Sequence, residues 1–132
     1  GAALARVDPA RYAALAPLRD ELERALGGSV LINGAGAPRL PHVSNFSAQG
    51  WSGERLVAAL DVRGVCVSTG SACRVGTAEP SAAVAAMAGS ERAKAAVRVS
   101  FGEDLDEQRL RAGIAVLLPL LQRHGSSASR AG

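Results

Sequence analysis

The sequence predicts an α/β (α+β) domain in which a small sheet of about three to four strands is backed by helices. Two observations support this fold class. Apolar residues recur at helical spacing in some segments and alternate in others, and the helical and extended segments do not follow the regular βα repeat of a doubly wound sheet. Almost half of the 132 residues (48%) are apolar, which is enough for a packed core.

The first half of the chain reads as a helix, two strands and a second helix. Asp8 and Pro9 form a helix start, and Pro17 should kink or split the helix that continues to Leu26. Short strands are predicted over 29–33 and 42–48, and Ser52 caps a helix through 53–62.

The second half alternates strands and helices around one long loop. A short buried strand is expected at 65–68, a loop at 69–79, and a helix from Pro80 through Met87. A further strand covers 96–101. Asp104 and Glu107 resemble a capping box before a long helix that should end near Gln122, with one apolar face: Leu110, Ile114, Leu117 and Leu121.

Composition excludes several classes of protein. The net charge is +3, but no cluster of Lys and Arg is interleaved with aromatic residues, so no nucleic-acid partner is expected. No apolar run is long enough to span a bilayer, so no membrane association is expected either. Two cysteines form no disulfide framework, which favours a reduced, cytoplasmic protein. His42 and His124 lack ligand-like neighbours, so no metal site is expected.

The two cysteines lie in different surroundings. Cys66 stands between two valines and is expected to be a buried core residue. Cys73 follows the small residues of "STGSA" and precedes Arg74, a cation that favours the nucleophilic thiolate. Cys73 is therefore either a reactive thiol or an incidental surface thiol.

Arg98 is the second candidate for a functional role. It lies in the otherwise apolar strand "AVRVSF", where an unpaired buried charge is costly. Its guanidinium either pairs with a core carboxylate or binds an anionic ligand, and a carboxylate fits its two parallel N–H donors.

Four motifs follow one another along the second half of the chain. They are Glu54, Leu56 and Leu60, the run Ser68-Thr69-Gly70-Ser71-Ala72-Cys73, Glu79-Pro80-Ser81, and Arg98, Ser100 and Gly102. Together they resemble the C-terminal part of the pyridoxal-phosphate (PLP) cysteine desulfurases of the class V aminotransferase family. The long loop after the cysteine is similar to the iron–sulfur-cluster and nitrogen-fixation type.

This resemblance implies a function for both candidates. Cys73 would remove sulfur from L-cysteine, giving L-alanine and a persulfide that passes to a sulfur acceptor or iron–sulfur scaffold protein. Arg98 would bind the substrate carboxylate. The family uses PLP and forms homodimers. Ser71 and Asn45 lie in or near the matching motifs, and the resemblance assigns no role to them.

One feature of the family is missing. Its PLP lysine belongs to a His-Lys motif, whereas this chain has no such pair and a single lysine, Lys94. We therefore expect residues 1–124 to be the C-terminal small domain, 125–132 to be a flexible tail, and the large cofactor-binding domain to be absent, so that the chain alone is inactive.

Other functions remain open at the level of sequence. The chain is alternatively a stand-alone persulfide carrier or interaction module, a plain redox or surface-thiol protein, or part of a selenocysteine lyase or another class V aminotransferase relative. A substrate-binding arginine has no purpose in a pure carrier, which favours the desulfurase.

Overall fold

The computed structural model describes residues 7–70 and 79–128, with side chains as far as Gln122. Within these residues an antiparallel three-stranded sheet has the order β1-β2-β3, with β1 at Val30–Ile32, β2 at Val43–Ala48 and β3 at Ala96–Ser100. Each strand lies within a range predicted from the sequence. The α+β fold class with a small sheet is confirmed.

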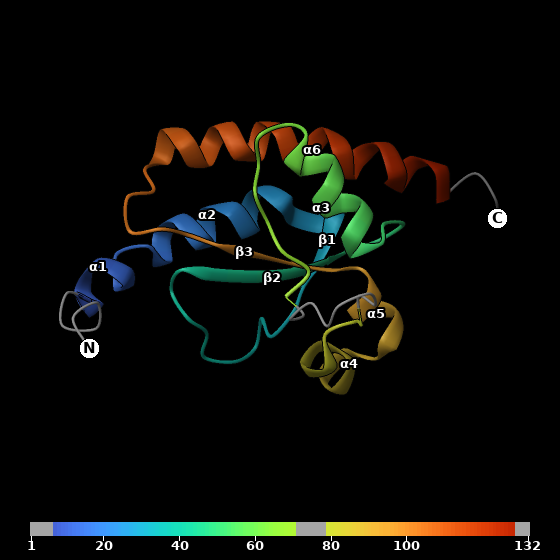
Figure 1. Cartoon of the computed structure of the whole chain (residues 1–132), viewed down its shortest axis with the longest axis horizontal. Helices are drawn as coiled ribbons and strands as arrows, with labels where there is room; N and C mark the ends of the chain where they lie inside the picture. The colour runs from blue at the N-terminus through green and yellow to red at the C-terminus, as the bar shows by residue number, and fades with distance from the viewer. Residues whose placement is uncertain (1–6, 71–78, 129–132) are drawn as a thin grey trace.

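The helices divide between the two faces of the sheet (Figure 1). The N-terminal α1 leads into a layer on one face, and a short helical pair lies on the other face, at one end of the strands. The layer consists of α2 (Ala16–Leu26), α3 (Gly53–Asp61) and α6 (Glu107–Ala128). The short pair consists of α4 (Ala82–Ala88) and α5 (Ser90–Lys94), and α1 covers Pro9–Ala13.

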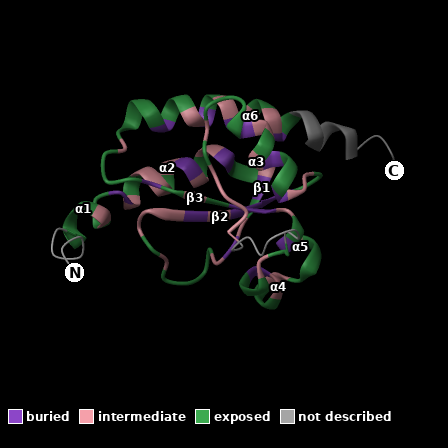
Figure 2. Cartoon of the chain, in the orientation of Figure 1, coloured by how far each residue is buried: buried purple, intermediate pink, exposed green. Residues whose placement is uncertain are grey.

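The main core lies between the sheet and the helix layer (Figure 2). Phe46 of β2, Val97 of β3, and Leu56 and Leu60 of α3 have no exposed surface. The predicted apolar face of α6 is also buried in this core: Leu110, Ile114, Leu117 and Leu121. The open face of the sheet carries a smaller cluster under α4 and α5.

Local signals in the sequence set several helix ends as expected. The Asp8 side chain accepts a hydrogen bond from the backbone of Ala10 at 2.9 Å, and α1 stops at Ala13 before α2 begins with Pro17 in its first turn. Pro17 therefore splits the helix, because proline is favoured in the first turn of a helix and disrupts the hydrogen bonds of a helix interior. Ser52 caps α3 through the backbone N–H of Arg55.

The start and the end of α6 differ from the prediction. Asp106, not Asp104, accepts the capping hydrogen bond, from the backbone of Arg109 at 2.8 Å, while Asp104 pairs with the Arg109 guanidinium. The helix continues to Ala128, past the end expected near Gln122, and 129–132 lie outside the described residues. Among the described helices, α6 included, none has both the length and the apolar character needed to span a bilayer.

The prediction of a buried strand around Cys66 was wrong. Residues 65–67 are not a strand, only an isolated bridge joins Ser68 to Arg98, and Cys66 is exposed. Val65 and Val67 pack against the core. Because side chains alternate along an extended segment, the cysteine between them points outward.

A short polar network attaches the connection between β1 and β2 to α2. Arg39 of this connection donates through both terminal nitrogens to the Glu23 carboxylate, and Ser44 of β2 donates to the same carboxylate at 2.7 Å. The hydrogen bond to Glu23 raises the pKa of Arg39 above its usual value. Both charged side chains are largely buried, at 21% and 13% exposure.

We expect Glu23→Gln to lower the free energy of unfolding by about 1.5–3 kcal/mol, since it leaves Arg39 without its countercharge. Urea unfolding of the two proteins measures this difference. Glu21→Gln is the matched control on the same helix, because Glu21 only forms a surface ion pair with Arg111 at 3.4 Å. A loss for Glu23→Gln no larger than the control's would contradict a stabilising role for this network.

Candidate functional site

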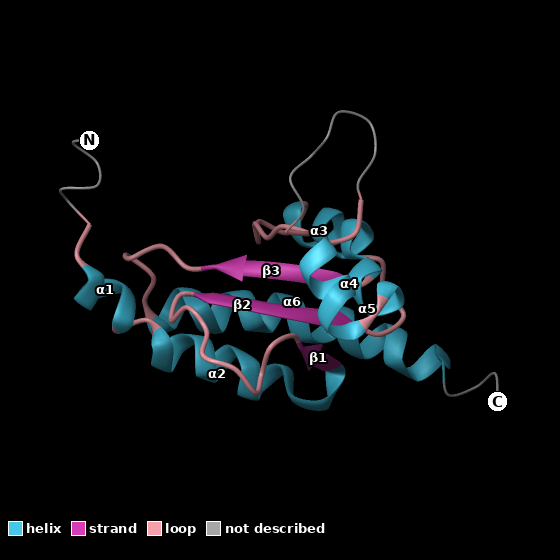
Figure 3. Ribbon diagram, turned by 90° about the horizontal axis from the view of Figure 1, so that it is seen from below, coloured by secondary structure: helices cyan, strands magenta, loops and turns pink. Residues whose placement is uncertain are grey.

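The candidate site lies on the open face of the sheet (Figure 3). Along β2, Ser44 and Phe46 point to the helix layer, where Ser44 contacts Glu23 of α2. Asn45 lies between them and therefore points to the opposite face. The antiparallel register places Asn45 directly opposite Arg98 of β3, so both side chains share that open face.

Asn45 and Arg98 form a close cross-strand pair. The Arg98 backbone N–H and C=O bond to Ser68 on the outer side of β3, at 2.6 and 3.0 Å, and so do not bond to β2. Opposed residues of this non-hydrogen-bonded type have Cα atoms about 4.5 Å apart, which brings their side chains close together.

Arg98 is exposed rather than buried, and no helix of the described residues covers the middle of this sheet face. No carboxylate among the described residues forms an ion pair with it. The sequence left two roles open for Arg98. The first, an ion pair with a core carboxylate, is wrong as far as residues 7–70 and 79–122 are concerned, because none of their carboxylates pairs with it. The guanidinium faces the side of the sheet from which a ligand can approach.

The segment that leads to Cys73 passes beside this arginine. Ser68 bridges to Arg98, and the Ser68 hydroxyl accepts a hydrogen bond from the backbone of Gly70 at 3.0 Å. Gly70 adopts a φ of +78°, and a Cβ on it would lie 3.8 Å from Cβ of Arg98. Cys73 and Ser71 themselves lie outside the described residues.

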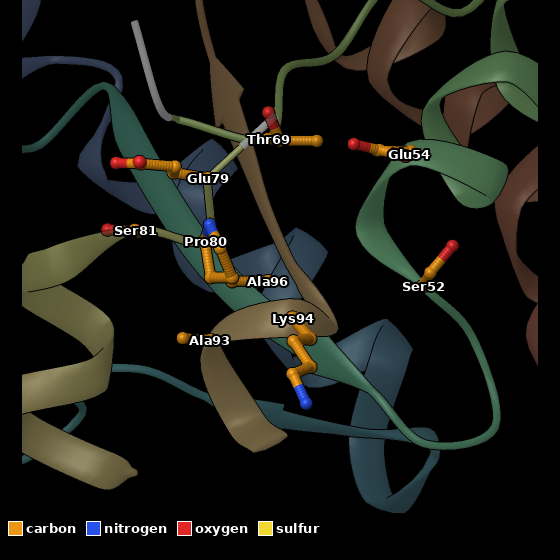
Figure 4. A pocket seen from close by; sticks show the side chains of 9 residues that line it. All are labelled: Ser52, Glu54, Thr69, Glu79, Pro80, Ser81, Ala93, Lys94 and Ala96. Atoms are coloured by element: carbon orange, nitrogen blue, oxygen red, sulfur yellow. The ribbon is translucent and has the colours of Figure 1, made fainter. Parts of the chain in front are cut away.

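The two ends of the segment that contains Cys73 meet at one pocket (Figure 4). Thr69 before the segment and Glu79, Pro80 and Ser81 after it line a pocket of about 210 Å³ together with Glu54 and Lys94. Figure 4 shows Glu54 directed toward Thr69 and the Lys94 side chain directed away from it. The chain therefore leaves and rejoins the described fold at neighbouring points beside the start of β3.

Sequence reasoning missed a polar network behind Asn45. Asn33, which follows β1, is 5% exposed and donates from Nδ2 to Oδ1 of Asn45 at 2.6 Å and to Oγ of Ser47 at 2.9 Å. Ser47 in turn donates to the backbone carbonyl of Arg92 at 2.8 Å. The alternation of β2 already places Asn45 and Ser47 on one face, but only the pairing with β1 brings Asn33 between them.

Lys94 does not fit the role of a PLP lysine. It lies at the end of α5 with its side chain 57% exposed, and its ammonium pairs with Glu91 at 2.6 Å. A Schiff-base lysine attacks as a neutral amine from a desolvated or cationic setting, and Lys94 has neither. The described residues therefore offer no lysine for this cofactor.

Comparisons with known proteins place the chain in a family. The profile of the family described as Aminotransferase class-V matches residues 12–112. The chain is 33% identical over 110 residues to a cysteine desulfurase of Klebsiella pneumoniae, covering 80% of this chain and 28% of that protein. It is 38% identical over 90 residues to an IscS-like cysteine desulfurase of Mycobacterium tuberculosis, covering 67% of this chain and 23% of that protein.

A solved structure shares the fold. A NifS-like protein from Rickettsia africae superposes with a TM-score of 0.67 at 22% identity, covering 84% of this chain and 29% of that one. The chain thus spans less than a third of the length of these relatives. Because the family profile covers most of the sequence, residues 12–112 of 132, the chain belongs to the class V aminotransferase family.

Proposed function

We propose that this chain provides the sulfur nucleophile and the substrate-carboxylate anchor of a cysteine desulfurase. The observation that carries the proposal is Arg98, exposed on the open sheet face and in contact with the segment that leads to Cys73. Relatives named cysteine desulfurases, 33% and 38% identical to it, support the choice of reaction.

The reaction transfers one sulfur atom. The Cys73 thiolate attacks the sulfur of L-cysteine and forms an S–S bond, while the bond between that sulfur and the substrate Cβ breaks. The electron pair of the broken bond remains on Cβ, which takes up a proton, so the products are L-alanine and a persulfide on Cys73. PLP, when bound, provides the electron acceptor for such chemistry, and we infer that residues outside this chain hold it.

Chain connectivity supports Cys73 as the attacking thiol. In the sequence, Cys73 follows Gly70 by three positions, and a Cβ on Gly70 would lie 3.8 Å from Cβ of Arg98. Arg98 would hold the carboxylate of L-cysteine through two parallel hydrogen bonds.

The persulfide sulfur needs an acceptor. We infer a sulfur-acceptor or iron–sulfur scaffold protein as the partner, a homodimer as the assembly of the complete enzyme, and the cytoplasm as its location. The composition supports a reducing location, since two cysteines in 132 residues make no disulfide framework.

A chimera tests the proposal. In this chimera the present chain replaces the segment of the Klebsiella pneumoniae cysteine desulfurase to which it aligns, so that the parent enzyme provides the PLP site. We expect the chimera to release L-alanine from L-cysteine and the chain alone with PLP to release none. Alanine formed by the chain alone would contradict the assignment of the cofactor to other residues. A correctly folded, PLP-loaded chimera that forms none would contradict the function.

In this chimera, Arg98→Ala is expected to lower kcat/KM for L-cysteine by about 10- to 100-fold, mainly through KM, because charge-assisted hydrogen bonds to the carboxylate are lost. Arg55→Ala on the exposed side of α3 is the matched control and should leave both constants unchanged. Steady-state rates of alanine formation measure the effect. A KM that does not respond to the Arg98 change would remove its assigned role.

A further inference from the structure

We propose that Asn45 is a second ligand of the substrate carboxylate and that it donates a hydrogen bond from Nδ2 beside the Arg98 guanidinium. This inference rests on the proposed function for the identity of the substrate. The carboxylate site itself follows from the geometry of β2 and β3.

The orientation of the Asn45 amide is fixed from behind. Its Oδ1 accepts the 2.6 Å hydrogen bond from Nδ2 of the buried Asn33, whose own backbone N–H donates to the Asn45 carbonyl at 2.8 Å. Since Asn33 offers a donor at this position, the acceptor end of the Asn45 amide turns inward and its NH₂ group turns away.

The donor end of this amide and the Cβ of Arg98 both lie next to Gly70. A Cβ built on Gly70 would lie 3.9 Å from Nδ2 of Asn45 and 3.8 Å from Cβ of Arg98, so these groups surround one spot on the open face. Asn45 is only partly buried, and its Nδ2 donates no hydrogen bond within the described part of the chain. An amide with one end bound and the other end free is prepared for a ligand acceptor.

The neighbouring residues explain why the amide holds this orientation. Asn33 also donates to Ser47, and the Ser47 hydroxyl is directed to the Arg92 carbonyl at 2.8 Å, so Ser47 can serve Asn33 only as an acceptor. Arg92 further donates to the carbonyl of Ile32 in β1 at 2.8 Å. The network thus extends from α5 through Asn33 to the site.

The donors present suit a single carboxylate. The fork of Arg98 uses one lone pair on each carboxylate oxygen, and each oxygen retains a second lone pair. The Asn45 NH₂ can occupy one of these without adding charge. One guanidinium and one amide therefore balance a monoanion such as the α-carboxylate of an amino acid.

The test uses binding of L-alanine, the proposed product, to the ¹⁵N-labelled chain, followed by NMR. We expect the side-chain NH₂ signals of Asn45 to shift saturably with L-alanine and to stay in place with L-alaninamide, which lacks the carboxylate. Asn45→Asp keeps an acceptor for Asn33 and adds a charge beside Arg98. It should weaken L-alanine binding about tenfold, whereas Ser100→Ala, on the same exposed face of β3, should not change it.

A double-mutant cycle separates a ligand contact from a structural role. In an Arg98→Ala background, the loss of L-alanine affinity caused by Asn45→Asp should differ in size from the loss in the wild-type background, because two residues that hold the same group are energetically coupled. An equal loss in both backgrounds, or unchanged affinity in a variant with a native-like spectrum, would overturn the inference, as would absence of L-alanine binding to the wild-type chain. None of these readouts needs PLP, Cys73 or turnover, so an inactive chimera contradicts the proposed function and leaves this result intact.

Discussion

Cys73→Ala is expected to abolish alanine formation by the chimera while PLP binding persists. Without the thiolate, no atom accepts the sulfur of L-cysteine, so the carbon–sulfur bond has no route to cleavage by sulfur transfer. The rate of alanine release measures the loss, and the visible absorption of PLP shows that the cofactor is still bound.

Cys66→Ala is the matched control for this experiment. Cys66 is exposed, seven positions before Cys73, and lies beside an apolar pocket between α6 and residues 65–67 rather than on the open sheet face. We expect full activity from this variant. A large loss with Cys66→Ala and none with Cys73→Ala would reverse the assignment of the two thiols.

The second large effect concerns Gly53, the first residue of α3. It is buried, and a Cβ at this position would lie 2.5 Å from the backbone carbonyl oxygen of Ala96 in β3 and 3.4 Å from Cγ2 of Thr69. The oxygen belongs to a strand and cannot rotate away. Gly53→Ala should therefore lower the free energy of unfolding by about 2–3 kcal/mol, since either α3 or β3 must move.

Gly113→Ala is the matched control in the interior of α6. A Cβ there meets no atom within 4 Å, and alanine has the higher helix propensity, so this variant should gain about 0.5–1 kcal/mol. Urea unfolding of both variants tests the pair. Equal stability of Gly53→Ala and the wild-type chain would show that α3 does not pack on β3 as closely as the structure places it.

Local signals in the sequence predicted the elements whose causes are local. Short apolar or alternating runs placed the three strands, Pro17 divided the first helix, and Ser52 started α3, because each of these effects acts within a few residues. Helix α5 was not predicted. Its five polar and small residues carry no apolar period, and it is held by contacts with α4 and β2.

Features that depend on pairing between distant segments could not be predicted in this way. Cys66 was expected to be buried because valines flank it. Whether 65–68 extend the sheet depends on the outer edge of β3, and of these four residues only Ser68 pairs with that edge. The ion pair between Glu23 and Arg39 joins residues 16 positions apart across a turn-rich connection. The periodicity of apolar residues in the sequence cannot predict such a contact.

At the candidate site, too, the sequence predicts some features and only the pairing of the strands shows the others. The motif resemblance identified Arg98, and the alternation of β2 put Asn45 on one face of its strand. That these two residues oppose each other, and that Asn33 orients the amide of Asn45, follows from the register of β2 against β3 and β1. The role of Cys73 stays a prediction, since it lies outside the described residues.

The most direct test of the central claim is the intact mass of the chimera after incubation with L-cysteine, read without reductant and followed by peptide mapping of the thiols. The proposed function predicts one added sulfur atom on the peptide that contains Cys73, none on the peptide that contains Cys66, and L-alanine in the solution. Alanine release with the added sulfur on any other residue, or with no added sulfur before an acceptor is supplied, would contradict Cys73 as the sulfur nucleophile.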